Sequence, residues 1–334
     1  MKTIHIVLGV LLIGLAYSSA LADGENGGYA GEFLKYDFSA RALGMGGAYT
    51  AVAEGSAGIR YNPAGLSGAD HLQAGFTYSK LTLDRRLNYA EILFPLPKKA
   101  VIGLSWVNAG VGDVKQRNSN GEVVGDLKNN QNSFNITFGR RIIDLLAIGV
   151  NVRYVQYNYA ELIASTMGID FGAMGYFMDG DLTAGLKVSN IASKYSWDTG
   201  NYYETSGTTY DEDFPIVYRF GAAYRFLGKS ITAAADYEKD TKNDGRLHIG
   251  GEYWYYTKSE ESSVDDFTGE VKTKTAVRKF LSARLGYDAG SLTFGLGLRR
   301  RMGKFAIKLD YSFATGRQDG LSPDHLFTLG IGYY

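Results

Sequence analysis

The run FSARALGMGGAYTAVAEGSAGIRYNPAGLSG, residues 38–68, differs from the rest of the chain in composition and in pattern. Its residues are mostly small, and its glycines are too frequent for a regular helix or strand. After residue 70 the chain changes, and apolar and polar residues alternate in runs of about ten. Because small residues let backbone approach backbone closely, we predict that residues 38–68 form a plug inside a barrel built from the later runs.

Alternation is longest late in the chain. From Ile216 to Phe226, and again from Phe305 to Phe313, apolar side chains take every second position, which predicts strands with one apolar face. About 14 such runs are present, and an even number of strands is typical of single-chain bacterial transmembrane barrels. The predicted strands cover residues 70–80, 85–95, 99–109, 131–140, 145–158, 164–177, 181–192, 213–226, 229–239, 245–256, 278–288, 291–301, 303–315 and 324–334.

Composition agrees with this fold and excludes several classes of function. The 334 residues include 43 glycines, 25 tyrosines and 17 phenylalanines but only 5 prolines, a mixture that suits β-structure with aromatic girdles. Cysteine is absent, so disulfide and thiolate chemistry are excluded. The 35 basic and 35 acidic residues balance, so no nucleic-acid footprint is expected.

The N-terminus has the features of a secretory signal peptide over residues 1–22. Lys2 provides the positive start, an apolar stretch follows, and Ala20-Leu21-Ala22 provides a cleavage site. The alternative is a membrane anchor, but the apolar stretch is shorter than the ~20 residues of a spanning helix. We therefore expect a signal peptide, a periplasmic segment and plug over 23–68, with 23–37 in the periplasm, and a barrel over 69–334 in a Gram-negative outer membrane.

The apolar face of the strands could also cover the core of a soluble β-sandwich or propeller. The signal peptide, the aromatic strand ends and the absence of repeats favour lipid as its contact. The polar face would then line the lumen, where buried charges need partners, so we expect ion pairs among wall residues and with Arg41, Glu54 and Arg60 of the plug. These charges either lock the plug to the wall, which we favour, or guide a substrate. The main lumen charges are Arg153, Arg219, Arg225, Asp236, Glu252, Arg284 and Asp310.

The connections between the predicted strands alternate in length, with one exception. Short turns are predicted at one end of the barrel, and long polar loops over 110–130 and 193–212 at the other. The charged segment 257–277 is long but falls at the short-turn end. Either one strand is miscounted or this segment protrudes, and we favour a protrusion.

We find no catalytic or metal-binding constellation. The chain has 4 histidines, and His71, His248 and His325 fall in different predicted strands without ligand spacing. The glycines at 44, 46 and 47 resemble a phosphate-binding loop, but no strand precedes them. We therefore expect no metal, no cofactor and no enzymatic activity.

The run Ser39–Gly47, followed by Asn62-Pro63-Ala64-Gly65-Leu66, resembles the N-terminal segment of the PorV/PorQ family, which is related to the FadL/TodX hydrophobic-compound transporters. In FadL-like proteins the corresponding segment is a hatch inside a barrel of 14 strands. The resemblance implies that hatch movement would open a path for substrate. The residues it assigns to the hatch and its gating are Arg41, Gly44, Gly46, Gly47, Asn62, Pro63 and Ala64.

Two functions follow as hypotheses. The first is passive transport of hydrophobic or amphipathic small molecules through a plugged barrel that contacts outer-membrane lipid. The alternative is a PorV-like structural role in protein secretion or surface assembly, with a protein partner bound at 257–277. No aromatic-lined pocket can be assigned from the sequence, so the substrate is not predicted.

Overall fold

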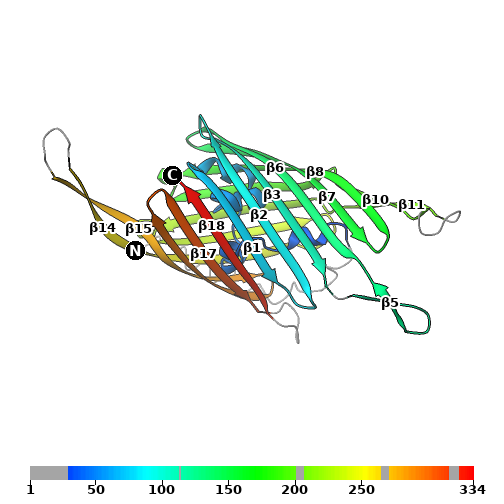
Figure 1. Cartoon of the computed structure of the whole chain (residues 1–334). Coiled ribbons are helices and arrows are strands. Elements are labelled where there is room, and N and C mark those ends of the chain that lie inside the picture. Colours follow the sequence, from blue (N-terminus) through cyan, green and yellow to red (C-terminus); the bar gives the residue numbers. More distant parts are fainter. Residues whose placement is uncertain (1–28, 113, 201–206, 265–270, 316–322) are drawn as a thin grey trace.

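The computed structural model describes residues 29–112, 114–200, 207–264, 271–315 and 323–334, with the backbone alone for 258–264 and 271–277. Within these ranges fourteen antiparallel strands close into one barrel, which confirms the predicted fold (Figure 1). The ring closes where β1 pairs with β18. The wall strands are β1 Leu72–Lys80, β2 Arg85–Leu96, β3 Ala100–Val111, β6 Asn129–Ile143, β7 Leu146–Tyr159, β8 Leu162–Phe177, β9 Leu182–Ile191, β12 Val217–Phe226, β13 Ile231–Asp240, β14 Arg246–Val264, β15 Val271–Asp288, β16 Ser291–Met302, β17 Phe305–Ala314 and β18 Asp324–Tyr333.

The alternation in the sequence appears in the wall as two faces. In β16, Leu292, Phe294 and Leu296 are exposed on the outside, while Ser291 and Thr293 are buried on the inside. Because the sheet is closed, its strands satisfy one another's backbone groups, which is the condition for crossing lipid. Among the described residues, no helix is both long enough and apolar enough to cross a membrane.

The two ends of the barrel differ in their connections. At the end where β1 begins and β18 ends, which we call the short-turn end, residues 97–99, 144–145, 178–181, 227–230 and 303–304 connect neighbouring strands. Residues 178–180 of this set form the short helix η5 Met178–Gly180. The opposite end, the long-loop end, carries two additional hairpins: β4 Lys115–Arg117 with β5 Val123–Asp126, and β10 Lys194–Asp198 with β11 Thr209–Asp213. The segments 110–130 and 193–212 were predicted as loops, and strand formers such as Val123, Tyr195 and Trp197 account for the hairpins within them.

The segment 257–277 continues two strands of the wall. Strands β14 and β15 stay paired beyond the barrel as far as Val264 and Val271, after a register shift between Tyr255 and Tyr256. The resulting hairpin projects past the short-turn end (Figure 1). The strand count therefore stands, and the long connection is a protrusion.

The hatch, residues 38–68, lies inside the barrel as a chain of short helices. These are α2 Ala40–Gly44, η3 Gly55–Ala57, α3 Gly58–Tyr61 and η4 Pro63–Gly68. Helix α2 packs on β15 to β18, η3 contacts β1 and β2, and η4 packs on β3 and β6 to β8. The hatch thus touches the wall around most of its circumference.

The residues before the hatch differ from the expectation of a segment outside the barrel. The short helix η2, Glu32–Lys35, and its neighbours pack inside the long-loop end, where Phe33 and Leu34 are 4% exposed. Burial of these apolar side chains explains their position. The predicted signal peptide, residues 1–22, lies outside the described residues.

Candidate functional site

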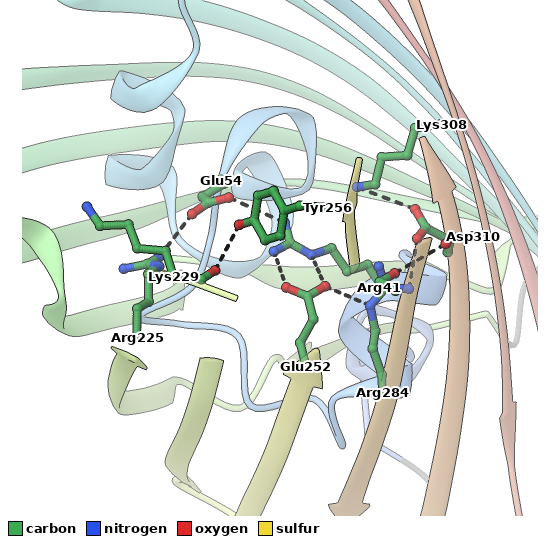
Figure 2. A network of polar contacts seen from close by, with 11 residues as sticks. Arg41, Glu54, Arg225, Lys229, Glu252, Tyr256, Arg284, Lys308 and Asp310 are labelled. Atoms are coloured by element: carbon green, nitrogen blue, oxygen red, sulfur yellow. Dashed lines mark hydrogen bonds and ion pairs between the residues drawn. The ribbon is translucent and has the colours of Figure 1, made fainter. Parts of the chain in front are cut away.

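A chain of buried ion pairs joins the hatch to the wall. Arg41, on α2, donates to both carboxylate oxygens of Glu252 on β14, from Nε at 2.8 Å and from Nη2 at 2.6 Å. Arg284 on β15 donates to the same carboxylate at 2.8 Å and pairs with Asp310 on β17 at 2.8 Å (Figure 2). Two cations therefore balance two anions, and the bidentate geometry belongs to the strongest class of protein ion pair.

The chain continues toward the short-turn end through Glu54. Its carboxylate pairs with Arg41 at 3.4 Å and with Arg225 of β12 at 2.9 Å (Figure 2). Its side chain is 47% exposed, so this pair is more solvated than that of Glu252. Partial burial opposes ionisation of Glu54, but the Arg41 and Arg225 guanidinium groups outweigh it and lower the pKa to about 2.

A second group of wall charges binds the hatch backbone. Asp236 on β13 accepts hydrogen bonds from the backbone N–H groups of Tyr49 and Thr50 at 3.0 and 2.9 Å. Arg219 on β12 donates to the carbonyl of Gly47 at 2.9 Å and pairs with Asp236 at 3.4 Å. These contacts satisfy polar groups of an irregular segment that has no regular ladder of its own.

One predicted lumen charge, Arg153, has wall partners. It donates to Asp170 on β8 at 2.6 Å and to Asn190 on β9 at 2.8 Å. The neighbouring contact between wall and hatch comes from Lys187, whose ammonium group donates to the Arg60 carbonyl. The structure thus brings Arg219, Arg225, Asp236 and Glu252 onto the hatch and places Arg153 beside it.

The Asn-Pro-Ala run shapes the second half of the hatch. The Asn62 side-chain oxygen accepts from the Ala64 N–H at 3.1 Å and caps η4, while Pro63 occupies its first turn. The Asn62 amide donates to the carbonyls of Thr50 in the hatch and Ala173 in β8, both at 3.0 Å. One side chain therefore joins two parts of the hatch and the wall.

The hatch glycines sit where backbone meets backbone. Gly46 has φ 63°, and a Cβ there would lie 2.5 Å from backbone atoms of Ile249 and Tyr287. Gly47 has φ 72° and faces His248, and Gly44 packs on the Gly295 backbone of β16. At Gly46 and Gly47 the positive φ and the close contact together require glycine, and at Gly44 the close contact alone favours it.

The wall has matching glycines that the sequence analysis did not single out. A Cβ at any of them would overlap hatch atoms, so the inner wall surface is shaped to the hatch. The available signal was glycine inside a predicted strand, which marks close approach of another backbone. These residues are Gly149, Gly172, Gly185, Gly250 and Gly286.

A polar cavity of about 1050 Å³ lies between the hatch and the short-turn end. Side chains of both signs line it, including Glu54, Glu91, Arg225 and Lys308. Among the described residues, no group of three or more His, Cys, Asp or Glu side chains is arranged to hold a metal ion.

The long-loop end of the lumen contains an aromatic cluster. Tyr195 contacts Phe214 and Trp197 with ring centroids 4.8 and 5.6 Å apart, and Tyr157 lies 5.3 Å from Trp197. On the hatch side, Phe38 stacks on Tyr89 of β2 at 5.4 Å. This cluster was not predicted from the sequence, although apolar residues take the inward phase of their strands at Leu87, Tyr89, Val107 and Val155.

Comparisons with known proteins show the fold. No family model matches the chain, and no curated protein matches it. The crystal structure of the Pseudomonas putida toluene transporter TodX is 14% identical, with a TM-score of 0.56 over 89% of this chain and 97% of that one. A Pseudomonas aeruginosa FadL homologue is 13% identical, with a TM-score of 0.53 over 86% and 96%. The monoaromatic hydrocarbon channel CymD is 10% identical, with a TM-score of 0.53 over 87% and 96%.

These likenesses assign the chain the barrel fold of the FadL/TodX channels. The narrower resemblance to the PorV/PorQ family stays a prediction.

Proposed function

We propose that this protein is an outer-membrane channel for hydrophobic or amphipathic small molecules, closed in the present conformation by the hatch. The observation that carries the proposal is the aromatic cluster inside the long-loop end. A water-filled pore has a polar lining, whereas this lumen has a packed apolar region whose side chains would contact a hydrophobic molecule favourably once they separate.

Two further observations support membrane transport. Large apolar side chains are exposed around the outside of the wall, where lipid would cover them. Among the proteins of the same fold, TodX is described as a toluene transporter and CymD as a monoaromatic hydrocarbon channel. We extend hydrophobic-compound transport to this chain as a proposal, together with the signal peptide and the outer-membrane location.

The proposed path runs from the aromatic cluster, past the hatch, to the polar cavity at the short-turn end. The hatch blocks it, because Tyr49, Met45 and Leu66 are completely buried between the two regions. Passage therefore requires the hatch to move. We propose that Asn62, Pro63 and Ala64 permit this movement, and that Arg41 and the wall charges limit it by locking the first half of the hatch.

A fluorescence experiment tests whether hydrophobic molecules enter the cluster. The chain has 3 tryptophans, so Trp106→Phe with Trp254→Phe leaves Trp197 as the reporter. We expect saturable quenching by a brominated monoaromatic hydrocarbon, and loss of saturation in the same protein carrying Tyr195→Ser. The matched control is Tyr218→Ser, an exposed position on wall strand β12. Equal quenching curves for all three proteins would exclude the cluster as the binding region.

An uptake assay in cells then distinguishes transport of a hydrophobic molecule from binding alone. Cells that lack their own hydrocarbon channels are to be supplied with radiolabelled substrate, with and without this protein in the outer membrane. Faster uptake that depends on the protein supports the channel. Binding without any change in uptake would contradict transport.

The second hypothesis, a structural or partner-binding role in secretion, is favoured by one observation. The β14–β15 hairpin extends past the wall at the short-turn end, where it is available to another protein. Deleting residues 258–276 should then abolish cross-linking to that partner and leave barrel folding intact. Unchanged cross-linking after the deletion would remove this hypothesis.

A further inference from the structure

The barrel wall is interrupted between β15 and β16. These strands pair from Asp288 and Ser291 down to Leu281 and Leu298, and the pairing stops there. Strand β16 continues on its other side, where it pairs with β17 as far as Met302. Over residues 299–302, β16 therefore has no strand beside it on the β15 side.

The interruption has a structural cause. After the register shift between Tyr255 and Tyr256, β15 follows β14 into the projecting hairpin. Between Leu281 and the tip of the hairpin, β15 therefore pairs with β14 alone and no longer pairs with β16. The gap between them is a cavity of about 710 Å³, which we call the notch.

The notch is strongly basic. Among the described residues that line it, five are cations from its two sides and none is acidic. No described carboxylate forms an ion pair with Lys279, Arg299, Arg300 or Arg301. This contrasts with the core of the lumen, where Arg41 and Arg284 are balanced by carboxylates. The lining cations are Arg278, Lys279, Arg299, Arg300 and Arg301.

Two of the arginines are held by one aromatic residue. Arg299 donates to the Tyr334 hydroxyl at 2.8 Å, and the Arg301 guanidinium lies 4.4 Å from the Tyr334 ring centroid. This leaves other guanidinium N–H groups of both arginines available to an anion. The paired N–H groups of the planar arginine guanidinium match the spacing of phosphate and carboxylate oxygens.

The notch lies where the outer face of the wall changes from apolar to charged. Along the outward positions of β16, Leu296 and Leu298 are followed by Arg300. Exposed aromatic residues, Phe305 on β17 and Tyr333 on β18, lie at the same level of the barrel. Aromatic girdles and basic residues mark the boundary between the hydrocarbon core and the lipid head groups.

The notch also has an apolar side. Phe280 and Leu281 on β15 are 38% and 47% exposed, beside Leu298 on β16. Its inner side opens on the polar cavity of the lumen, because Lys279, Arg299, Ala306 and Tyr334 line both spaces. The site therefore presents cations toward the end of the barrel and apolar side chains toward lipid.

We infer that the notch between β15 and β16 binds an anionic membrane phospholipid. Lys279, Arg299, Arg300 and Arg301 would hold the phosphate head group, and the acyl chains would lie along Phe280, Leu281 and Leu298. Four of the cations, Lys279 and Arg299 to Arg301, have no described carboxylate partner, and their position at the lipid boundary favours a phospholipid over a soluble anion. This inference rests on the proposal that the barrel crosses a membrane.

Native mass spectrometry of the full chain, freed of lipid in mild detergent, tests the inference. Phosphatidylglycerol and oleate are added separately and in competition. We expect the wild type to retain phosphatidylglycerol in preference to oleate. In a protein carrying Arg299→Gln, Arg300→Gln and Arg301→Gln, affinity should fall on the order of a hundredfold, from the typical contribution of each cation near a lipid surface.

The matched control neutralises three exposed cations on another part of the same end, with Lys98→Gln, Lys99→Gln and Arg140→Gln. Its affinity should equal that of the wild type. Heat-modified gel migration checks that each barrel is folded, and Arg300→Gln alone, at an exposed position, serves if the triple variant does not fold.

Equal phosphatidylglycerol retention by the triple variant and the wild type would overturn the inference. So would preferential retention of oleate that the triple variant loses, which would assign the site to a carboxylate. The uptake assay distinguishes this failure from failure of the channel proposal. Transport without phosphatidylglycerol retention would contradict only the lipid site at the notch. Phosphatidylglycerol retention without transport would contradict only the channel function.

Discussion

At the scale of single residues, the hatch is held by charges that neutralise one another inside the barrel. Arg41 and Glu252 are 211 positions apart in the chain, yet their contact is bidentate and buried. A pair of this kind costs desolvation energy that only good geometry offsets. Removing one partner therefore leaves an uncompensated charge, which makes these residues sensitive to substitution.

Arg41→Ala should destabilise the protein by about 3 kcal/mol, because Glu252 keeps only Arg284 as its partner. The measurement is the temperature at which the folded gel band converts to the unfolded one. Arg117→Ala, on the exposed β4 strand, is the control and should leave this temperature unchanged. An unchanged temperature for Arg41→Ala would shift the role of the charges from locking the hatch to guiding a substrate.

Glu54 makes stability depend on pH in the acid range. Its pKa in the folded protein, about 2, is below the ordinary value of 4.5, so its stabilising effect is complete above pH 4.5 and is lost as pH falls toward 2. The melting difference between wild type and Glu54→Gln should follow this course. A difference that stays constant from pH 7 to about 2 would contradict it.

At the scale of elements, the hatch and the wall are complementary because glycines face each other across the contact. A Cβ at Gly250 of β14 would fall on the Met45 carbonyl, whereas a Cβ at the next residue, Gly251, has no neighbour closer than 4.0 Å. The two positions face opposite sides of the same strand. They form a matched pair for testing the fit.

Gly250→Ala should displace the first half of the hatch and raise ion conductance in planar bilayers, because the wall no longer admits the Met45 backbone. Gly251→Ala should conduct like the wild type. If both substitutions leave conductance unchanged, contact between these glycines and the hatch does not close the lumen.

Deletion of the complete hatch tests whether this segment closes the barrel. Deleting residues 38–68 should leave a barrel that folds, since the wall strands pair only with one another, but conducts ions freely. Deleting residues 115–126, which hold the β4–β5 hairpin at the long-loop end, is the control and should conduct like the wild type. A hatchless barrel with the low conductance of the wild type would disprove the plug.

At the scale of the whole molecule, two faces of one closed sheet have opposite chemistry. Trp106, in the outward phase of β3, should contact lipid, while Trp197 and Trp254 lie in the interior. In vesicles with brominated acyl chains, a protein with Trp106 as its only tryptophan should therefore be quenched most strongly. Stronger quenching of a Trp197-only or Trp254-only protein would contradict the orientation of the wall.

The sequence by itself determined the wall. Side chains alternate with a period of two in any strand, so all fourteen strands were recognisable before their partners were known. It also separated the hatch, whose glycines and Asn62-Pro63 turn fit no regular element. The charges of the polar face, among them Glu252 and Asp310, followed from the same alternation.

Tertiary structure alone decided which of these residues meet. Arg41 binds Glu252, and Arg219 donates to the Gly47 carbonyl, because closure of the barrel places strands distant in sequence around one hatch. The aromatic cluster forms because strands from both halves of the chain converge at the long-loop end. The notch exists because β15 leaves β16 after a register shift. Local patterns specify which face a side chain takes, but contacts across a closed barrel depend on the register of every strand between them.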